Sequence, residues 1–354
     1  MLNIRSCALM LSGLTALVLS APARAEVHEG PMSTQKIALG SGGGGPTGVQ
    51  VLNEFHMVHI DGFRGAKRVA ISTFNVAFPN EKLQSAETST SFKVGGITSI
   101  GTHFTRQISQ TKSARQHTVI QGIDAATRQR IADAAYADFV ERLTRSGYEV
   151  VGPDELAKLA PEFATWTAQP NFTRGRYGAY VAPTGRKLFL LRSDTAKPTS
   201  QGNIGQMAAA FQGLDSPQAF ARSPYLAHDA NLGIIAVTLV VDYGTYVNTG
   251  DTKRFNAEMA VGFTAGVTVQ GGSFYDTATL LDYWGPKSGG FPAIAALAAP
   301  LTSDLAFAAV NNGGNGEGEV DVKADPALFA TAAGEATQAA NTKLVAALSA
   351  AAAR

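Results

Sequence analysis

The tightest group of possible metal ligands in the sequence is His56 and His59, with Asp61 close behind. Two histidines three positions apart can bind one ion when they share a face of a helix. Gly62 and Gly65 instead favour a loop or the start of a strand, where the two imidazoles would diverge. No strong third ligand lies nearby to complete a site. We therefore expect surface histidines and no metal.

A serine-x-x-lysine pattern, typical of penicillin-recognising enzymes, occurs at Ser109-Gln110-Thr111-Lys112. In those enzymes the serine is the nucleophile, and Ser-Asp-Asn and Lys-Thr-Gly elements complete the site. This chain has neither element, and the short pattern recurs at Ser33-Thr34-Gln35-Lys36. A Gly-x-Ser-x-Gly nucleophile elbow is also missing. The sequence therefore predicts solvated polar surface at both places and assigns no catalytic residue.

The glycine-rich stretch from Gly40 to Gly48 could in principle cradle a phosphate. A phosphate-binding loop continues with Lys and Ser or Thr, whereas Gly48 is followed by Val49-Gln50. The composition is typical of a flexible tether. We therefore expect no nucleotide and no other cofactor.

Acidic and aromatic residues gather where two apolar runs end. Asp242 and Tyr243 follow the most apolar run of the chain, and Asp276 and Asp282 follow the next one. In open α/β sheets, ligands bind beside strand ends. These four residues are our candidates for ligand binding, and the alternative is that they cap and pack loops.

The start of the sequence resembles an export signal. Arg5 precedes an apolar run from Ala8 to Leu19, and Ala23-Arg24-Ala25 offers small residues for cleavage before Glu26. The run is shorter than the roughly 20 residues that cross a bilayer. We expect the protein to be periplasmic or secreted, with no transmembrane helix after cleavage.

Composition narrows the range of partners. The only cysteine, Cys7, lies inside the expected signal, which excludes disulfides, thiolate metal sites and the usual lipid anchor from the mature chain. The formal net charge is +1, with 29 basic and 28 acidic residues, so nothing attracts nucleic acid by bulk charge. At 45% hydrophobic residues, the chain has an ordinary globular composition.

Hydrophobic periodicity predicts a strand, a helix and a second strand in succession. The β-branched and aromatic run from Arg68 to Phe78 is typical of a buried strand. Asp124 can cap a helix that ends at Gly147, and Tyr148 to Val151 follows directly as a strand. This order is the raw material of an α/β layer.

Three further elements are predicted towards the end of the chain. Ile234 to Tyr246 favours a central strand, and Glu258 to Gln270 alternates like a half-exposed one. A final alanine-rich helix starts with Asp325 and Pro326. The helix should dock on the sheet, and its larger apolar residues should be buried against the sheet or a partner; they are Leu328, Phe329, Leu344 and Leu348.

Two long segments, 81–122 and 161–230, lack helical periodicity. Both favour β-hairpins laid beside the core, the second around a Pro183-Thr184-Gly185 turn. The predicted organisation is a signal at 1–25, a lead-in and Gly-rich linker at 26–66, and one α/β domain at 67–354 with those two insertions. We assign the fold to the α/β (α+β) class, as a mixed sheet with packed helices.

The order of these elements resembles the envelope α/β family that includes the amino-terminal domain of TolB and the curli-secretion protein CsgG. The residues that carry the resemblance are Arg68 to Phe74, Ala134 to Gly147, Tyr148 to Val151, Ile235 to Tyr246 and the final helix. The resemblance implies a non-catalytic envelope protein that binds other proteins or assembles into rings. The chain departs from the family by lacking an anchor cysteine and by its long insertions.

The sequence therefore favours a soluble exported protein, without enzymatic activity, that binds an envelope protein or component, or forms a homo-oligomer as part of an assembly. Two alternatives stay open. One is an exported hydrolase that uses the strand-end carboxylates Asp242, Asp276 and Asp282, which requires two carboxyl groups within about 10 Å. The other is an oligomeric outer-membrane secretion component built from the inserted hairpins, because the alternation from Ser89 to Thr118 is polar on one side.

Overall fold

The computed structural model describes residues 26–29, 50–52, 55–58, 64, 66–97, 103–161, 172–173, 179–188, 217–250, 259–270, 279–286, 293–312 and 317–353. In chain order its elements are β1 (Val27–Glu29), β2 (Gln50–Leu52), β3 (Phe55–Val58), β4 (Arg68–Phe78), β5 (Glu81–Ile97), β6 (His103–Gln121), α1 (Ala125–Arg145), β7 (Glu149–Val151), α2 (Pro153–Leu159), β8 (Phe172–Thr173), β9 (Ala179–Val181), α5 (Pro217–Asp229), β10 (Gly233–Gly250), β11 (Met259–Val269), β12 (Leu280–Trp284), β13 (Ala293–Leu297), β14 (Leu301–Ser303), β15 (Ala308–Asn312), β16 (Glu317–Ala324) and α6 (Pro326–Ala352). Of residues 83–97 and 103–115 only the backbone is described. The fold is of the mixed α+β class, with helices packed on a mixed sheet.

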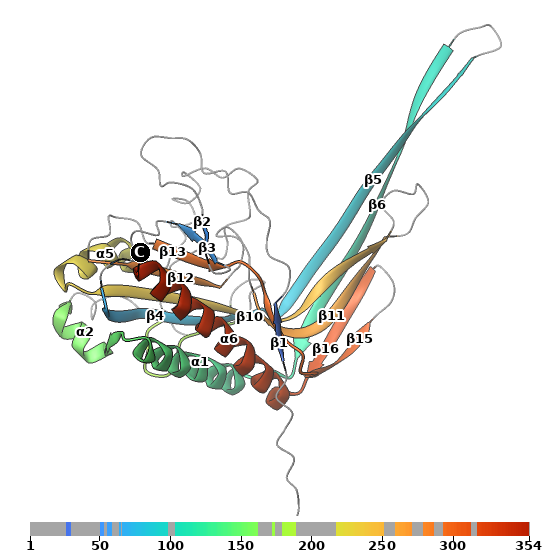
Figure 1. Cartoon of the computed structure of the whole chain (residues 1–354). Helices are drawn as coiled ribbons and strands as arrows, with labels where there is room; N and C mark the ends of the chain where they lie inside the picture. Colours follow the sequence, from blue (N-terminus) through green and yellow to red (C-terminus); the bar gives the residue numbers. More distant parts are fainter. Residues whose placement is uncertain are drawn as a thin grey trace, which may run out of the picture.

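The long strand β10 is the centre of the larger sheet. Its first half pairs in parallel with β4 on one side and antiparallel with β12 on the other. Its second half pairs antiparallel with β11, after a register shift between Asp242 and Gly244. One continuous strand thus belongs both to the body of the protein and to a hairpin that leaves it (Figure 1).

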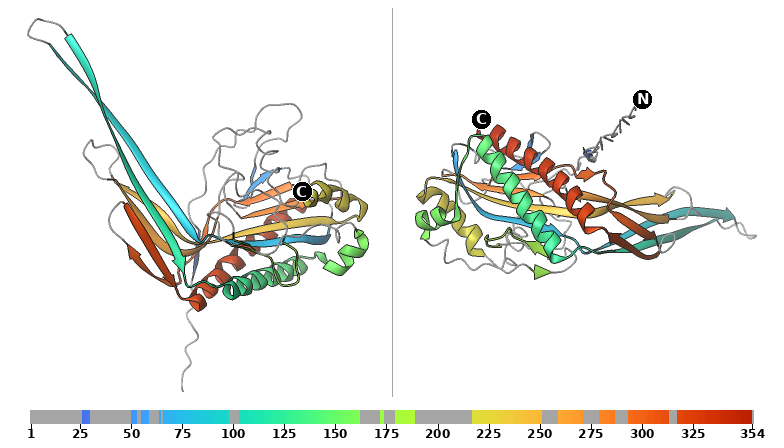
Figure 2. Two further views of the ribbon diagram at one scale, coloured as in Figure 1. Left: turned by 180° about the vertical axis from the view of Figure 1, so that it is seen from behind. Right: turned by 90° about the horizontal axis from the view of Figure 1, so that it is seen from below.

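Helices cover the two faces of this sheet. On one face α1 and α6 lie side by side, and α1 buries Ile131, Ala135, Phe139 and Leu143 (Figure 2). On the opposite face a smaller cluster packs α2 and α5 against the first residues of β10, around the fully buried Trp284. The sheet therefore needs apolar residues on both sides, which explains the apolar run at Ile234 to Val241, interrupted only by Thr238.

The second sheet has four strands in the order β15-β16-β6-β5. At its base β16 runs parallel to β6, from Arg115 to Gln121. Beyond Arg115 only β5 and β6 continue, as a two-stranded ribbon paired from Glu81↔Val119 to Ile97↔His103. We call this β5–β6 hairpin the arm, and Figure 1 shows it projecting far from the body.

Most predicted elements are confirmed. The strands at 68–78, 233–250 and 259–269 and the helices at 125–145 and 326–352 are present, with Asp124 and Asp325 as their N-caps. The Asp124 side chain accepts a hydrogen bond from Thr127 N at 2.7 Å, and Asp325 accepts from Ala327 N and Leu328 N.

Three expectations are wrong. Leu328 is 41% exposed, because the buried stripe of α6 begins one residue later, where Phe329 packs edge-on against Phe307. Segment 161–230 contains the helix α5, whose internal Pro224 weakens a helical pattern. Segment 81–122 is a hairpin, but it projects from the body and does not lie beside the core.

The lead-in at 26–66 supplies three short strands to the larger sheet. β1 pairs with β14, and β2 and β3 extend the sheet beyond β13. The turn at Pro183-Thr184-Gly185 is present, with Arg186 N donating to Pro183 O at 2.9 Å. The expected signal and Gly-rich tether lie outside the described residues. No helix in the described part of the chain is both long enough and apolar enough to cross a bilayer.

Candidate functional site

The most concentrated polar cluster lies where the arm meets the body. Here β10 bends, with an irregular register between Asp242 and Gly244. Gly244 has no room for a side chain, because a Cβ would lie 2.2 Å from the Phe263 ring and 2.6 Å from Thr264 O. The close approach of β11 to this bend therefore requires glycine.

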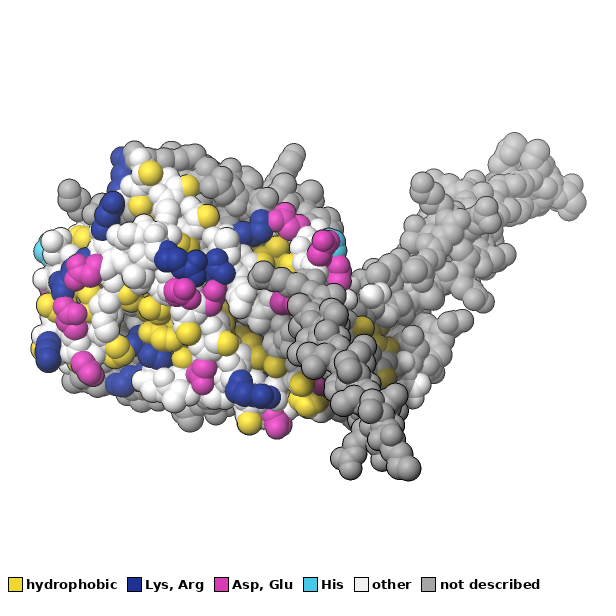
Figure 3. All heavy atoms as spheres, turned by 60° about the horizontal axis from the view of Figure 1, so that its bottom comes forward, with side chains coloured by type: hydrophobic (Ala, Val, Ile, Leu, Met, Phe, Trp, Pro, Cys, Tyr) yellow, Lys and Arg dark blue, Asp and Glu magenta, His cyan; other side chains and the backbone are white. Residues whose placement is uncertain are grey.

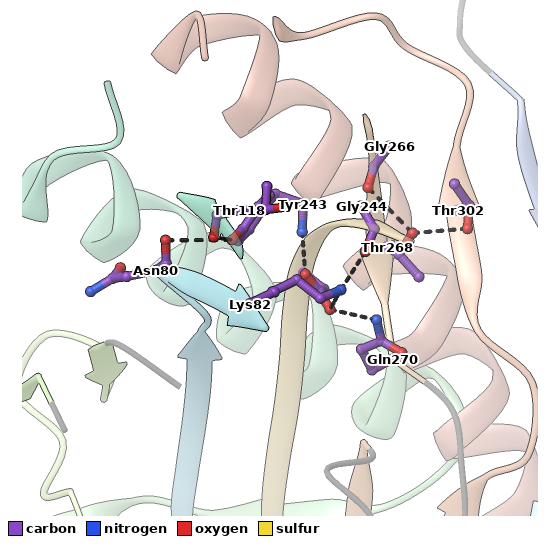
Figure 4. Close-up of polar contacts among 10 residues, drawn as sticks. Asn80, Lys82, Thr118, Tyr243, Gly244, Gly266, Thr268, Gln270 and Thr302 are labelled. Carbon is purple, nitrogen blue, oxygen red and sulfur yellow. Dashed lines mark hydrogen bonds and ion pairs between the residues drawn. The ribbon is translucent and has the colours of Figure 1, made fainter. Parts of the chain in front are cut away.

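Asp242 accepts three hydrogen bonds at the bend, and their donor residues Lys82, Gln270 and Tyr243 are labelled in Figure 4. Lys82 Nζ, at the start of β5, lies 2.7 Å from Asp242 Oδ2, and Gln270 Nε2, just after β11, lies 2.6 Å from the same oxygen. Tyr243 N donates to Oδ1 at 2.7 Å. Lys82 also donates to Gly244 O. The side chains of Lys82 and Asp242 are 19% and 6% exposed, so this is a largely buried ion pair.

Tyr243 reaches the other strand of the arm. Its hydroxyl donates to Thr118 O on β6 at 2.9 Å and lies 3.5 Å from Asn80 O. The ring is buried, packs against Phe263 with centroids 6.0 Å apart, and lies 5.8 Å from the Lys82 ammonium. That distance is within the range of a cation–π interaction.

The four residues predicted to bind a ligand do not form one group. Asp242 and Tyr243 lie together, but their contacts are with Lys82, Thr118 and Gln270 of the same chain. Asp276 lies outside the described residues. Asp282 is buried on β12, and the ligand-binding role of these residues stays a prediction.

The separation of the two described aspartates bears on the hydrolase alternative. Asp282 lies opposite Ala236 of β10, six residues before Asp242 on the same strand. At roughly 3.3 Å per residue, their backbones are about 20 Å apart. Paired acid and base catalysis on a glycosidic bond needs about 10 Å or less. Asp242 and Asp282 therefore do not form that pair.

The serine-x-x-lysine pattern lies on an extended strand of the arm. Ser109 pairs with Ser91 and Lys112 pairs with Thr88. Residues three positions apart on a strand belong to opposite faces of the sheet, so Ser109 and Lys112 do not occupy the same face. The helix start that the penicillin-recognising pattern requires is not formed here.

That His56 and His59 bind no metal stays a prediction. His56 lies on β3, whereas His59 and Asp61 are outside the described residues. Within the described part of the chain, no three His, Cys, Asp or Glu residues are placed to hold an ion.

Two half-buried arginines bind the backbone of β4 and the link that follows it. Burial lowers the pKa of Arg128 on α1, which donates to Asn80 Oδ1 at 2.8 Å. Burial also lowers the pKa of Arg186, which donates to Ile71 O and lies 5.4 Å from the Tyr136 ring. Their contacts tie α1 and the turn after β9 to opposite ends of β4, which is a structural role.

Comparisons with known proteins gave no match among protein-family models, curated proteins or solved structures. The function must therefore be argued from the geometry of this chain.

That geometry reveals residues that the sequence did not single out. Lys82, Thr118 and Gln270 complete the cluster around Asp242, and Lys82 is separated from Asp242 by 160 positions. The only local signal is a lysine two residues after the Pro79-Asn80 stop of β4. Such a lysine is ordinarily solvated surface, so the pairing could not be read from sequence.

Proposed function

We propose that this chain is a non-catalytic envelope protein that works by self-association, with the arm of one copy pairing with a neighbouring copy. The observation that carries the proposal is the arm itself. From Ala86 and Ala114 outwards, neither edge of the β5–β6 ribbon has a strand partner among the described residues. An isolated two-stranded hairpin is marginally stable in water and gains stability from further strands.

The sequence of the arm supports pairing. Exposed strand edges are usually protected by charges, proline or bulges, because unprotected edges add strands from other chains. Residues 88–92 on β5 read Thr-Ser-Thr-Ser-Phe, with no charge and no proline. The pairing of β5 with β6 runs without a register shift along its whole length. Both features favour a second copy as the occupant of the β5 edge.

Among the described residues, the helical face of the body offers less for a partner to recognise. Over the helical face that α1 covers, basic and acidic side chains are interspersed (Figure 3). One pair on α1 joins such charges, Arg145 with Glu141 at 2.7 Å, with side chains 63% and 64% exposed. Exposed pairs of this kind contribute little and resemble ordinary solvated surface. The resemblance to envelope proteins that assemble into rings agrees with self-association through the arm.

A shortened arm tests the proposal. The register places Thr88 opposite Lys112, so joining them through Asn-Gly removes residues 89–111 and leaves a two-residue hairpin turn. We expect the parent to form oligomers by light scattering after size exclusion, and the shortened variant to be a monomer with an unchanged melting temperature. Arg145→Ala on α1 is the control and should remain oligomeric. A parent that is monomeric in buffer, detergent and vesicles would refute self-association, and binding to a different envelope protein would then be the reading to pursue.

A second candidate is the outer-membrane secretion component, which one observation favours. In the register of the arm, even-numbered residues lie opposite even-numbered residues, so Phe92 pairs with Ile108 and Gly96 with Phe104. The same face also carries Arg106 opposite Val94 and Lys112 opposite Thr88, so its apolar part is the outer one around Phe92 and Phe104. The odd-numbered face of the same region is polar, with Ser91 and Gln107 among its members. Thr88 to Ile97 spans about 30 Å at roughly 3.3 Å per residue, which matches the thickness of a bilayer core of about 30 Å.

Vesicle flotation separates this candidate from assembly in solution. With phosphatidylcholine and phosphatidylglycerol vesicles, the parent should float, and Phe92→Ser with Phe104→Ser should stay in the soluble fraction. Lys93→Ser with Gln107→Ser changes the odd-numbered face by the same number of residues and should float like the parent. Equal behaviour of the two double variants would exclude insertion by the even-numbered face.

A further inference from the structure

The junction of arm and body connects Asp242 and Tyr243, two consecutive residues of β10, to both strands of the arm. Asp242 binds the Lys82 ammonium on β5, and Tyr243 donates to the Thr118 carbonyl on β6. In the register of the hairpin, Lys82 and Thr118 are direct cross-strand partners. The body therefore binds a single cross-strand pair of the arm, Lys82 and Thr118, through one residue on each of its two strands (Figure 4). We call this cross-strand pair a rung of the arm.

We infer that this rung is a clamp that fixes the direction of the arm, and that breaking the Lys82–Asp242 pair frees the arm to swing while the α/β body stays folded. The clamp is defined as Lys82, Thr118, Asp242, Tyr243 and Gln270. It would act whatever the arm contacts, so the inference does not depend on self-association.

Because the clamp is buried, its hydrogen bonds hold the arm in one direction. A charge pair on the surface is screened by water and tolerates many geometries, whereas a buried pair is held by hydrogen bonds of defined direction. Asp242 receives donors on both carboxylate oxygens, and Lys82 is shared between Asp242 and Gly244 O. Removing Lys82 would leave a buried carboxylate short of its cation, which is unfavourable unless the junction opens to water.

The backbone around the clamp also favours one position of the arm. Gly244 follows immediately, and its missing side chain lets the Phe263 ring and Thr264 lie against the bend. On the other side of the junction, Arg128 donates a 2.8 Å hydrogen bond to Asn80, the second of the two residues between β4 and β5. Outside this region β16 supports β6 only as far as Arg115, so the arm beyond it depends on the base for its direction.

Hydrogen exchange followed by mass spectrometry tests the clamp on the full chain. In Lys82→Met we expect peptides from 81–87 and 115–121 to exchange at least about tenfold faster than in the parent, a factor equivalent to about 1.4 kcal/mol. Peptides from α1 and α6 should exchange as in the parent. Lys82→Arg keeps the cation and should restore most of the protection.

The matched control is Arg142→Met, which breaks an ion pair of similar burial on α1, 23% and 14% exposed, away from the arm. Unchanged exchange at the arm base in Lys82→Met would overturn the clamp. Equal acceleration in Arg142→Met would also overturn it, because the arm would then be reporting a general loss of stability. If Lys82→Met does not fold, Gln270→Ala removes one donor from the same carboxylate, and it must show the same regional effect for the inference to stand.

Discussion

Leu344 on α6 provides a quantitative test of how the terminal helix packs against the body. The helix carries three leucines, and the structure separates them: Leu344 and Leu348 are 0% and 1% exposed, whereas Leu328 is 41% exposed. Deleting the buried part of a leucine costs about 2 to 5 kcal/mol, because it removes transferred apolar surface and leaves a cavity. The same change on the surface is usually within about 0.5 kcal/mol.

We therefore expect Leu344→Ala to lower the free energy of unfolding by about 3 kcal/mol, and Leu328→Ala to change it by less than about 0.5. With a urea slope of about 3 kcal/mol per molar, the midpoint of Leu344→Ala should fall by roughly 1 M. Urea titration followed by circular dichroism measures the unfolding midpoints of both variants, and we expect their slopes to equal that of the parent. Equal shifts for Leu328→Ala and Leu344→Ala would refute the packing of α6 described above.

Further predictions concern the cap of α1 and two glycines. Hydrogen bonding to Thr127 lowers the pKa of Asp124 from the ordinary value of 3.8. The ionised Asp124 cap therefore stabilises the folded protein fully above pH 3.8, and this stabilisation is lost as the pH falls through the lower pKa of the folded state. Asp124→Asn keeps an acceptor but does not titrate, so urea titrations from pH 7 to 2 should show the parent losing stability relative to this variant below about pH 4. Gly233→Ala should destabilise by about 1 to 3 kcal/mol, because the new Cβ would lie 2.5 Å from the buried ring of Tyr283; a melting temperature equal to that of the parent would contradict this. Gly334→Ala on α6 meets nothing within 4 Å and should instead stabilise the protein by up to about 1 kcal/mol in the same melting assay.

The elements that the sequence predicts well have local causes. The helix at 125–145 carries its own cap and an apolar stripe, and the strand at 68–78 is a run rich in β-branched and aromatic residues that is closed by Pro79. The final helix is fixed at its start by Asp325 and Pro326. Each of these signals lies within a few residues of the element that it specifies.

The parts that could not be predicted depend on distant residues. Whether a Ser/Thr/Gln-rich hairpin lies on the core or projects from it is decided by the clamp at its base, and that clamp joins positions 82, 118, 242 and 270. Alternation in the sequence predicts the strands of the arm but is silent about their direction. In the same way, Leu328 fits an apolar stripe by spacing, and only the position of Phe307 shows that the stripe begins at Phe329.

Strand β10 belongs both to the body and to the hairpin with β11 that leaves it, and this has a mechanical consequence. A pull on its far end, beyond Tyr243, acts along the strand and loads its ladders with β4 and β12 in shear. Hydrogen bonds loaded in shear must break together, whereas those at the end of a peeled hairpin break one at a time. A force on the arm enters differently, through the Pro79-Asn80 link and the rung at Lys82. The molecule would therefore yield first at the root of its arm, and the strand that crosses the body would hold under tension after the arm had given way.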